Sequence, residues 1–93
     1  MDDSFIERLE ELHTFPGPFT MKVIGAQSDG FVELVLSTVQ GELQLDETPQ
    51  HSLKRTPNGR HISVTVDMRV ESARQVAGLY VRLQSMDEVQ FLM

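Results

Sequence analysis

The stretch from His61 to Val70 alternates without a fault between polar and apolar side chains, and it constrains the fold more than any other feature. In an extended strand, the apolar members of this stretch all fall on one side. These members are Ile62, Val64, Val66, Met68 and Val70. Such a strand buries one face and leaves the other in water or against a partner, which speaks against a parallel sheet covered on both faces.

The first half of the chain predicts two helices and one strand. Ser4 and Glu7 form a capping box for a short N-terminal helix with an apolar stripe of Phe5, Leu9 and Leu12, ended by residues 15–18. Residues 19–24 alternate as a strand that Gly25 would end. A second helical stripe follows the turn over 26–30, with Ser28 or Asp29 as its cap and Gly41 as its stop. The members of this stripe are Val32, Val35, Leu36 and Val39.

The second half predicts a hairpin, a helix and a last strand. Residues 42–48 read as loop and residues 49–55 as a strand, which Pro57-Asn58-Gly59 connects to the strand over 61–70. A two-residue Asn58-Gly59 turn sets His51 opposite Val66, on the apolar face, and leaves His61 on the polar face. Ser72 and Gln75 form another capping box, before a helical stripe and a short strand over 89–93. This stripe contains Val76, Leu79, Tyr80 and Leu83.

The order of these elements predicts an α+β fold. After the first helix the order is βαββαβ, as in a ferredoxin-like sandwich with a four-stranded antiparallel sheet and two helices on one face. We expect a single domain over 1–93, with a helical extension over 1–14 and the core over 15–93. The second and fourth strands would be the sheet edges. The fourth, Val89 to Met93, carries no charge that would prevent pairing with another chain.

Composition limits the classes of function. The chain has a net charge of −6, which argues against nucleic-acid and anionic-membrane binding, although Lys54, Arg55 and Arg60 gather in one hairpin. It has no cysteine and no apolar run of the roughly 20 residues that a membrane helix needs. Its first residues are acidic where a secretory signal would be basic, so the cytoplasm is the expected location.

No pattern in the sequence indicates catalysis. His13, His51 and His61 do not converge, so we expect no metal, and no nucleotide or nucleophile motif implies a cofactor. The turn after the first strand resembles that of acylphosphatases, but Val32 stands where their phosphate-gripping arginine belongs. RNA-recognition domains stack bases on aromatic side chains of the open sheet face, which we expect to lack aromatics here. An enzyme using His61 or Asp67 remains a minor alternative.

The turn from Gly25 to Gly30 is the candidate ligand site. Its two glycines allow close approach of a ligand, and the amides of the following helix favour a carboxylate or phosphate. A plain connection with helix capping is the alternative interpretation. The candidate ligand-binding residues are Lys22, Gly25, Ser28, Asp29, Gly30 and His61.

Two motifs resemble the YbeD-like family of small, uncharacterised bacterial proteins. The first runs from Phe15 to Gly25 and includes Phe15-Pro16, Pro18-Phe19-Thr20 and Lys22-Val23. The second is His61, Ser63-Val64-Thr65-Val66, Val76, Leu79-Tyr80 and Leu83. This resemblance implies a ferredoxin-like fold similar to that of ACT regulatory domains, which bind small molecules between paired copies.

The expected function is therefore that of a non-enzymatic regulatory or protein-interaction module. It would act through a homo-oligomer or a separate protein partner, by way of the strand Val89 to Met93. A small-metabolite binder, recognising an amino acid or another carboxylate at the turn after the first strand, is the alternative. Nucleic-acid binding through the Lys54–Arg60 hairpin is a further, minor one.

Overall fold

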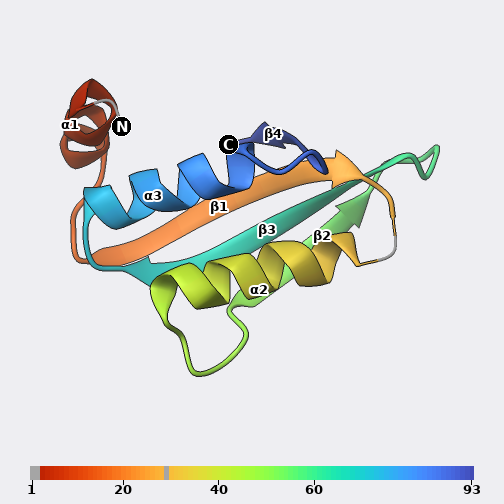
Figure 1. Cartoon of the computed structure of the whole chain (residues 1–93), viewed down its shortest axis with the longest axis horizontal. Coiled ribbons are helices and arrows are strands. Elements are labelled where there is room, and N and C mark those ends of the chain that lie inside the picture. Colours follow the sequence, from red (N-terminus) through yellow and green to blue (C-terminus); the bar gives the residue numbers. More distant parts are fainter. Residues whose placement is uncertain (1–2, 29) are drawn as a thin grey trace.

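The computed structural model, which describes residues 3–28 and 30–93, confirms the ferredoxin-like fold (Figure 1). Two helices lie on one face of a four-stranded antiparallel sheet with the strand order β2-β3-β1-β4. The predicted edges, the second and fourth strands, are the edges observed. The elements are α1 (Asp3–Leu12), β1 (Gly17–Ala26), α2 (Phe31–Leu43), β2 (Gln50–Arg55), β3 (His61–Val70), α3 (Ala73–Gln84) and β4 (Val89–Leu92).

The alternation in β3 has the consequence expected from it. Its five apolar side chains are buried beneath α2 and α3, and its polar side chains lie on the uncovered face of the sheet, the open face. The helices supply matching stripes, in which Val35, Val39, Val76 and Leu79 have no exposed surface. The core is therefore a single apolar layer between the sheet and the helix pair, which is what a chain of this size can bury.

Strand β1 is longer than predicted at both ends. It pairs with β3 from Gly17 opposite Val70 to Ala26 opposite His61, so Gly25 does not end it. The backbone of Lys22 forms hydrogen bonds with Met93 on the β4 side, and by alternation the backbone nitrogen of Pro18 points to that same side. β4 does not extend that far, so no ladder hydrogen bond is lost there.

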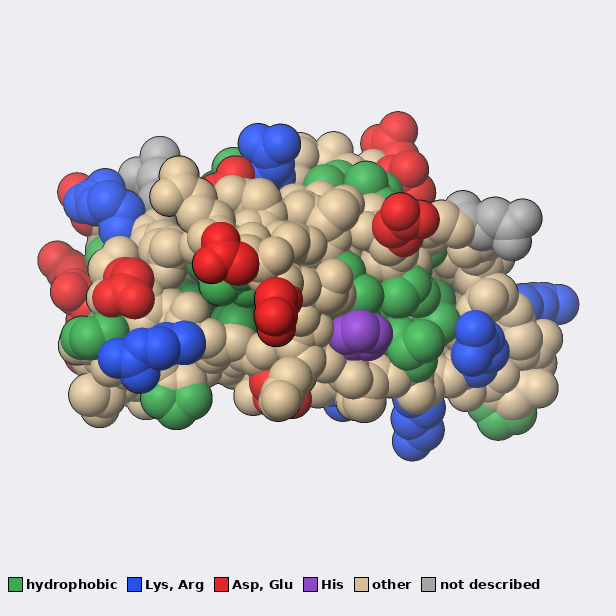
Figure 2. Space-filling view, turned by 90° about the horizontal axis from the view of Figure 1, so that it is seen from below, with side chains coloured by type: hydrophobic (Ala, Val, Ile, Leu, Met, Phe, Trp, Pro, Cys, Tyr) green, Lys and Arg blue, Asp and Glu red, His purple; other side chains and the backbone are tan. Residues whose placement is uncertain are grey.

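The hairpin register is as predicted, with His51 opposite Val66 and Arg55 opposite Ile62. His51 lies on the helix side of the sheet but is exposed, because β2 lies outside the area that α2 and α3 cover. Figure 2, seen from the side of α2 and β2, shows hydrophobic side chains at the surface beside a histidine and basic side chains. Leu53, 42% exposed, belongs to this uncovered edge.

Helix α2 corrects two predictions. Gly41 does not end it, because the helix continues to Leu43, whose burial extends the apolar stripe by one turn from Val39. The residue after the helix, Gln44, takes the left-handed conformation that ends it. Ser28 is not the cap: Gly30 is, with φ of 85° and no capping side chain, and Asp29 lies outside the described residues. Glu42 and Leu43 were wrongly predicted as loop.

The interior position of Gly41 leads to a stability prediction. Gly41 is exposed, and a Cβ built on it would meet no atom within 4 Å. Gly41→Ala should therefore raise the free energy of unfolding by about 0.5–1 kcal/mol, since alanine loses less backbone entropy on entering a helix. Urea denaturation followed by circular dichroism measures this change, and a lower midpoint for the variant would contradict the helical assignment.

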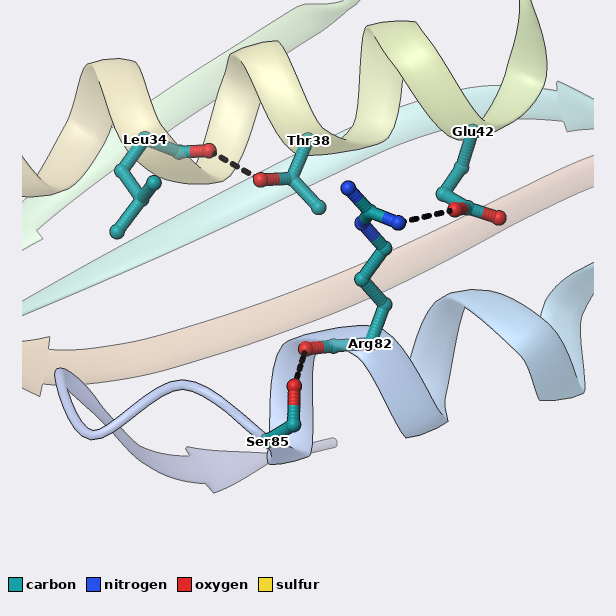
Figure 3. A network of polar contacts seen from close by, with 5 residues as sticks. All are labelled: Leu34, Thr38, Glu42, Arg82 and Ser85. Atoms are coloured by element: carbon teal, nitrogen blue, oxygen red, sulfur yellow. Dashed lines mark hydrogen bonds and ion pairs between the residues drawn. The ribbon is translucent and has the colours of Figure 1, made fainter.

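Helix α3 has the predicted N-terminal cap and forms an ion pair with α2. The Ser72 hydroxyl accepts a hydrogen bond from the Gln75 amide at 3.1 Å, so the predicted cap is confirmed. Arg82 on α3 forms an ion pair with Glu42 on α2, at 3.4 Å (Figure 3). Because Arg82 is largely exposed, this pair contributes little to stability.

Helix α1 packs on the outer side of α3. The Phe5 ring stands edge-on to Tyr80, with 5.4 Å between centroids, and partial burial raises the pKa of the Tyr80 hydroxyl. Ile6 and Leu9 join the buried core, whereas Leu12 is 69% exposed. The predicted stripe of Phe5, Leu9 and Leu12 was thus wrong at its last member. Ser4, predicted to cap this helix, lies within its described range, Asp3–Leu12.

Candidate functional site

The residues predicted to form a ligand site do not come together in one place. Lys22 and His61 lie on the open face, where Lys22 is opposite Thr65 and His61 is opposite Ala26. Ser28 and Gly30 instead line a shallow groove of about 470 Å³ beside the first turn of α2, on the helix side. The groove also contains Glu33 and Arg55, so it carries one carboxylate and one guanidinium group.

Gly25 is already surrounded by the chain itself. A Cβ at this position would collide with the carbonyl oxygen of Glu88 and with the ring of Phe31. Phe31 is the first residue of α2 and is 2% exposed, so its ring closes this end of the core. The glycine is therefore needed for packing between β1, α2 and the segment before β4. The space that it leaves is not open to a ligand.

The side chains of the open face form rows across the sheet, because paired residues in antiparallel strands point the same way. One row crosses all four strands. From β4 to β2 it consists of Phe91, Ile24, Ser63 and Lys54. The neighbouring row contains Met93, Lys22, Thr65 and Ser52.

One end of the first row forms a small pocket, the hairpin pocket, lined chiefly by Ile24, Lys54, Pro57, His61 and Ser63. Its volume is about 180 Å³. The hydroxyl oxygen of Ser63 is buried there and has no hydrogen-bond partner among the described residues. The sequence placed Ser63 on the open face through the alternation of β3. It did not indicate that Ile24 and Lys54 would enclose that side chain.

The other end of the row is apolar and exposed. A β-bulge between Ile24 and Gly25 shifts the register of β4, so Val89 faces the helices while Phe91 faces the open side. Phe91 and Met93 are 63% and 62% exposed. The expectation that the open face carries no aromatic side chain was therefore wrong. The register of a short strand past a bulge cannot be predicted from its own alternation.

The free edge of β4 also presents unpaired backbone. Lys22 and Met93 exchange two hydrogen bonds of 2.9 Å between their amides and carbonyls. In an antiparallel ladder the next residue points its N–H and C=O the other way, so those of Leu92 face away from β1. β4 is the last strand of the sheet on this side. A strand from another chain could pair there.

The described residues contain no arrangement typical of an enzyme active site. Within them, no polar or charged residue is buried as a whole, although the hydroxyl oxygen of the partly buried Ser63 is. No three His, Cys, Asp or Glu side chains among them gather to hold a metal ion. Catalytic groups depend on positions fixed by surrounding packing. On the open face, the Thr20 hydroxyl donates a hydrogen bond of 2.8 Å to Asp67. Among residues 3–28 and 30–93, no helix is long and apolar enough to cross a membrane.

Comparison with known proteins gives matches along most of the chain. The family model described as "Protein of unknown function (DUF493)" matches residues 10–93. A UPF0250 protein from Idiomarina loihiensis is 34% identical over 86 residues, which cover 92% of this chain and 96% of the relative. A UPF0250 protein from Cronobacter sakazakii is 36% identical over 86 residues, covering 92% and 97%.

A solved structure supports the fold. The solution structure of the hypothetical protein HP0495 from Helicobacter pylori aligns with a TM-score of 0.53 and 21% identity. The alignment covers 85% of this chain and 87% of that protein. At this identity the likeness concerns the fold alone.

Proposed function

The chain belongs to the DUF493 family, and from that premise we propose that it is a non-catalytic interaction module that joins another protein chain through the free edge of β4. Membership agrees with the family resemblance found in the segments Phe15–Gly25 and His61–Val66. The single observation that carries the proposal is the orientation of β4. The exposed apolar side chains of Phe91, on β4, and of Met93, directly after it, stand beside an unpaired backbone edge.

The bulge determines which side chains at the end of the chain face outwards. In a regular register, Val89, Phe91 and Met93 would share one face and could all pack beneath the helices. The bulge instead directs Val89 inwards and turns Phe91 and Met93 outwards. Exposed apolar side chains next to a free strand edge favour β-strand addition, in which backbone hydrogen bonds give affinity and side chains give specificity.

The partner that we propose is a second copy of this chain. β4 contains no charged residue, so antiparallel pairing of two β4 strands opposes no like charges. The other edge, β2, carries Lys54 and Arg55, which would repel their counterparts. Pairing through Leu92 of both copies would set Phe91 of one opposite Met93 of the other, a favourable sulfur–aromatic contact.

The resemblance to ACT domains supports the proposal by analogy of fold. Those domains also act in pairs, and a regulatory role here would require that a ligand change the pairing. The strand that pairs is short, four residues in β4, so few hydrogen bonds form and the association is weak. The experiment must therefore extend to high protein concentration.

Sedimentation equilibrium of the wild type from micromolar to millimolar concentration tests the proposal. We expect reversible dimerisation, and Phe91→Lys should lower the association constant by at least about tenfold, since it places two cations at the pairing edge. Leu53→Lys, which introduces the same charge at an exposed position of the opposite edge strand, is the control and should leave the constant unchanged. A wild type that remains monomeric throughout, or equal effects of both substitutions, would refute pairing through β4.

A further inference from the structure

We propose that the hairpin pocket on the open face binds the carboxylate of a small apolar acid. The site is separate from the free edge of β4 and from the Gly25–Gly30 turn. It is formed where the last residues of β2 and the first of β3 meet the end of β1. The inference does not depend on dimerisation.

The pocket has an apolar wall and a set of donors at its rim. The surface inside the pocket is almost entirely apolar, with Ile24 and Pro57 among its lining residues. Ser63, Lys54 and His61 are lining residues that carry polar groups at its rim. Its volume of about 180 Å³ is below the roughly 300–1,000 Å³ of sites for drug-sized ligands, so it selects a compact molecule. A short branched or cyclic body of a few carbon atoms fits this space.

The hydroxyl of Ser63 is the strongest indication of a ligand. Its oxygen is buried, and no described group forms a hydrogen bond with it. Such a group normally costs stability, because it loses hydrogen bonds with water and gains none in the protein. Because this oxygen has almost no accessible surface, the Ser63 side chain would have to rotate toward the pocket before a ligand oxygen could accept its hydrogen bond. The ligand would thereby satisfy a group that the free protein leaves unsatisfied.

The charges around the pocket favour an anion. Lys54, opposite Ser63, lines it on the open face, and no acidic residue lines it. Arg55 is opposite Ile62, so its side chain points to the helix side and does not add its charge to the pocket. The side chains of Lys54 and His61 form no hydrogen bond or ion pair that would occupy them within the described part of the chain. A carboxylate suits this set better than a phosphate, because one hydroxyl and one ammonium group satisfy a single negative charge, whereas the apolar wall offers nothing to a strongly hydrated dianion.

Titration of the protein with 3-methylbutanoate, followed by amide NMR spectra, is the direct test. We expect saturable shift changes centred on residues 54, 61 and 63. The uncharged analogue 3-methylbutan-1-ol and the small anion acetate should each bind at least about tenfold more weakly, because the alcohol lacks the carboxylate and acetate lacks the branched apolar body. No saturable change with 3-methylbutanoate, or equal affinity for the alcohol, would overturn the proposal.

Two variants test the donors individually. Ser63→Ala removes a buried unsatisfied hydroxyl, so the free protein should be no less stable, while the dissociation constant for 3-methylbutanoate should rise about tenfold. Lys54→Gln, at an exposed strand position, should have a similar effect on binding. Lys22→Gln removes the same charge from the neighbouring row and should change affinity by less than about twofold, because its charge is screened by solvent. Undiminished binding by Ser63→Ala would exclude the hairpin pocket as the site.

Discussion

Phe31→Ala is expected to lower the free energy of unfolding by about 3–5 kcal/mol. The Phe31 side chain is 2% exposed and lies against Gly25, at the end of the core where α2 begins. Alanine would leave a cavity that the backbone of β1 cannot fill. Since a domain of 93 residues has a total stability of roughly 5–14 kcal/mol, the variant should retain little margin.

Urea denaturation followed by circular dichroism measures this loss, and Phe91→Ala is the matched control. Phe91 is 63% exposed on β4, so its removal should change stability by less than about 0.5 kcal/mol. A similar loss in both variants would mean that Phe31 is not the closing side chain of this core. The same pair of variants separates the two roles of phenylalanine in the chain, because Phe91→Ala should weaken self-association and Phe31→Ala should act on folding.

Gly25→Ala is expected to destabilise the protein by about 3 kcal/mol, at the upper end of the cost of overpacking a core. The added methyl group would collide with the Phe31 ring and with the backbone carbonyl of Glu88. The ring can shift, but the carbonyl belongs to the segment that leads into β4. β4 would therefore have to move away from β1. Thermal unfolding compared with that of Gly41→Ala, which should be stabilised, measures the contrast between the two glycines.

A double-mutant cycle identifies the source of the cost at Gly25. If the Phe31 ring is one of the obstructions, the double variant Gly25→Ala, Phe31→Ala should be less destabilised than the sum of the single variants, with a coupling of about 1–2 kcal/mol. Strict additivity would show that the two residues do not share this contact. The backbone clash with Glu88 should remain, so complete rescue is not expected.

The fold could be predicted from the sequence because its main signals are local. The alternation of β3 assigned each of its side chains to a face, and the predicted pairing of His51 with Val66 is the one observed. The turn itself differs from the predicted two-residue turn, because the Gly59 amide donates to the Thr56 carbonyl and only Gly59 has a positive φ. The predicted stripes in α2 and α3 are buried except for Val32 and Tyr80, which are partly buried against the core. Each of these patterns depends on backbone periodicity or on a turn a few residues long, and each is therefore contained within its own segment.

The ends of elements were predicted less well, because they depend on neighbours in space. Gly25 and Gly41 are favourable stop residues when considered alone. β1 continues past Gly25 because β3 offers a partner for every residue to Ala26, and α2 continues past Gly41 because Leu43 gains burial. In both cases contacts with another element outweigh a local preference of about 1 kcal/mol.

The chain's own residues determined the sheet, the helix pair and the faces of β3, since these follow from side-chain spacing. Only the tertiary structure decided that Phe91 and Met93 face outwards, that Phe31 fills the space over Gly25, and that Ser63 shares a pocket with Ile24 and Lys54. The physical reason is that a bulge or a contact between distant segments depends on the relative placement of several strands, which no single segment encodes.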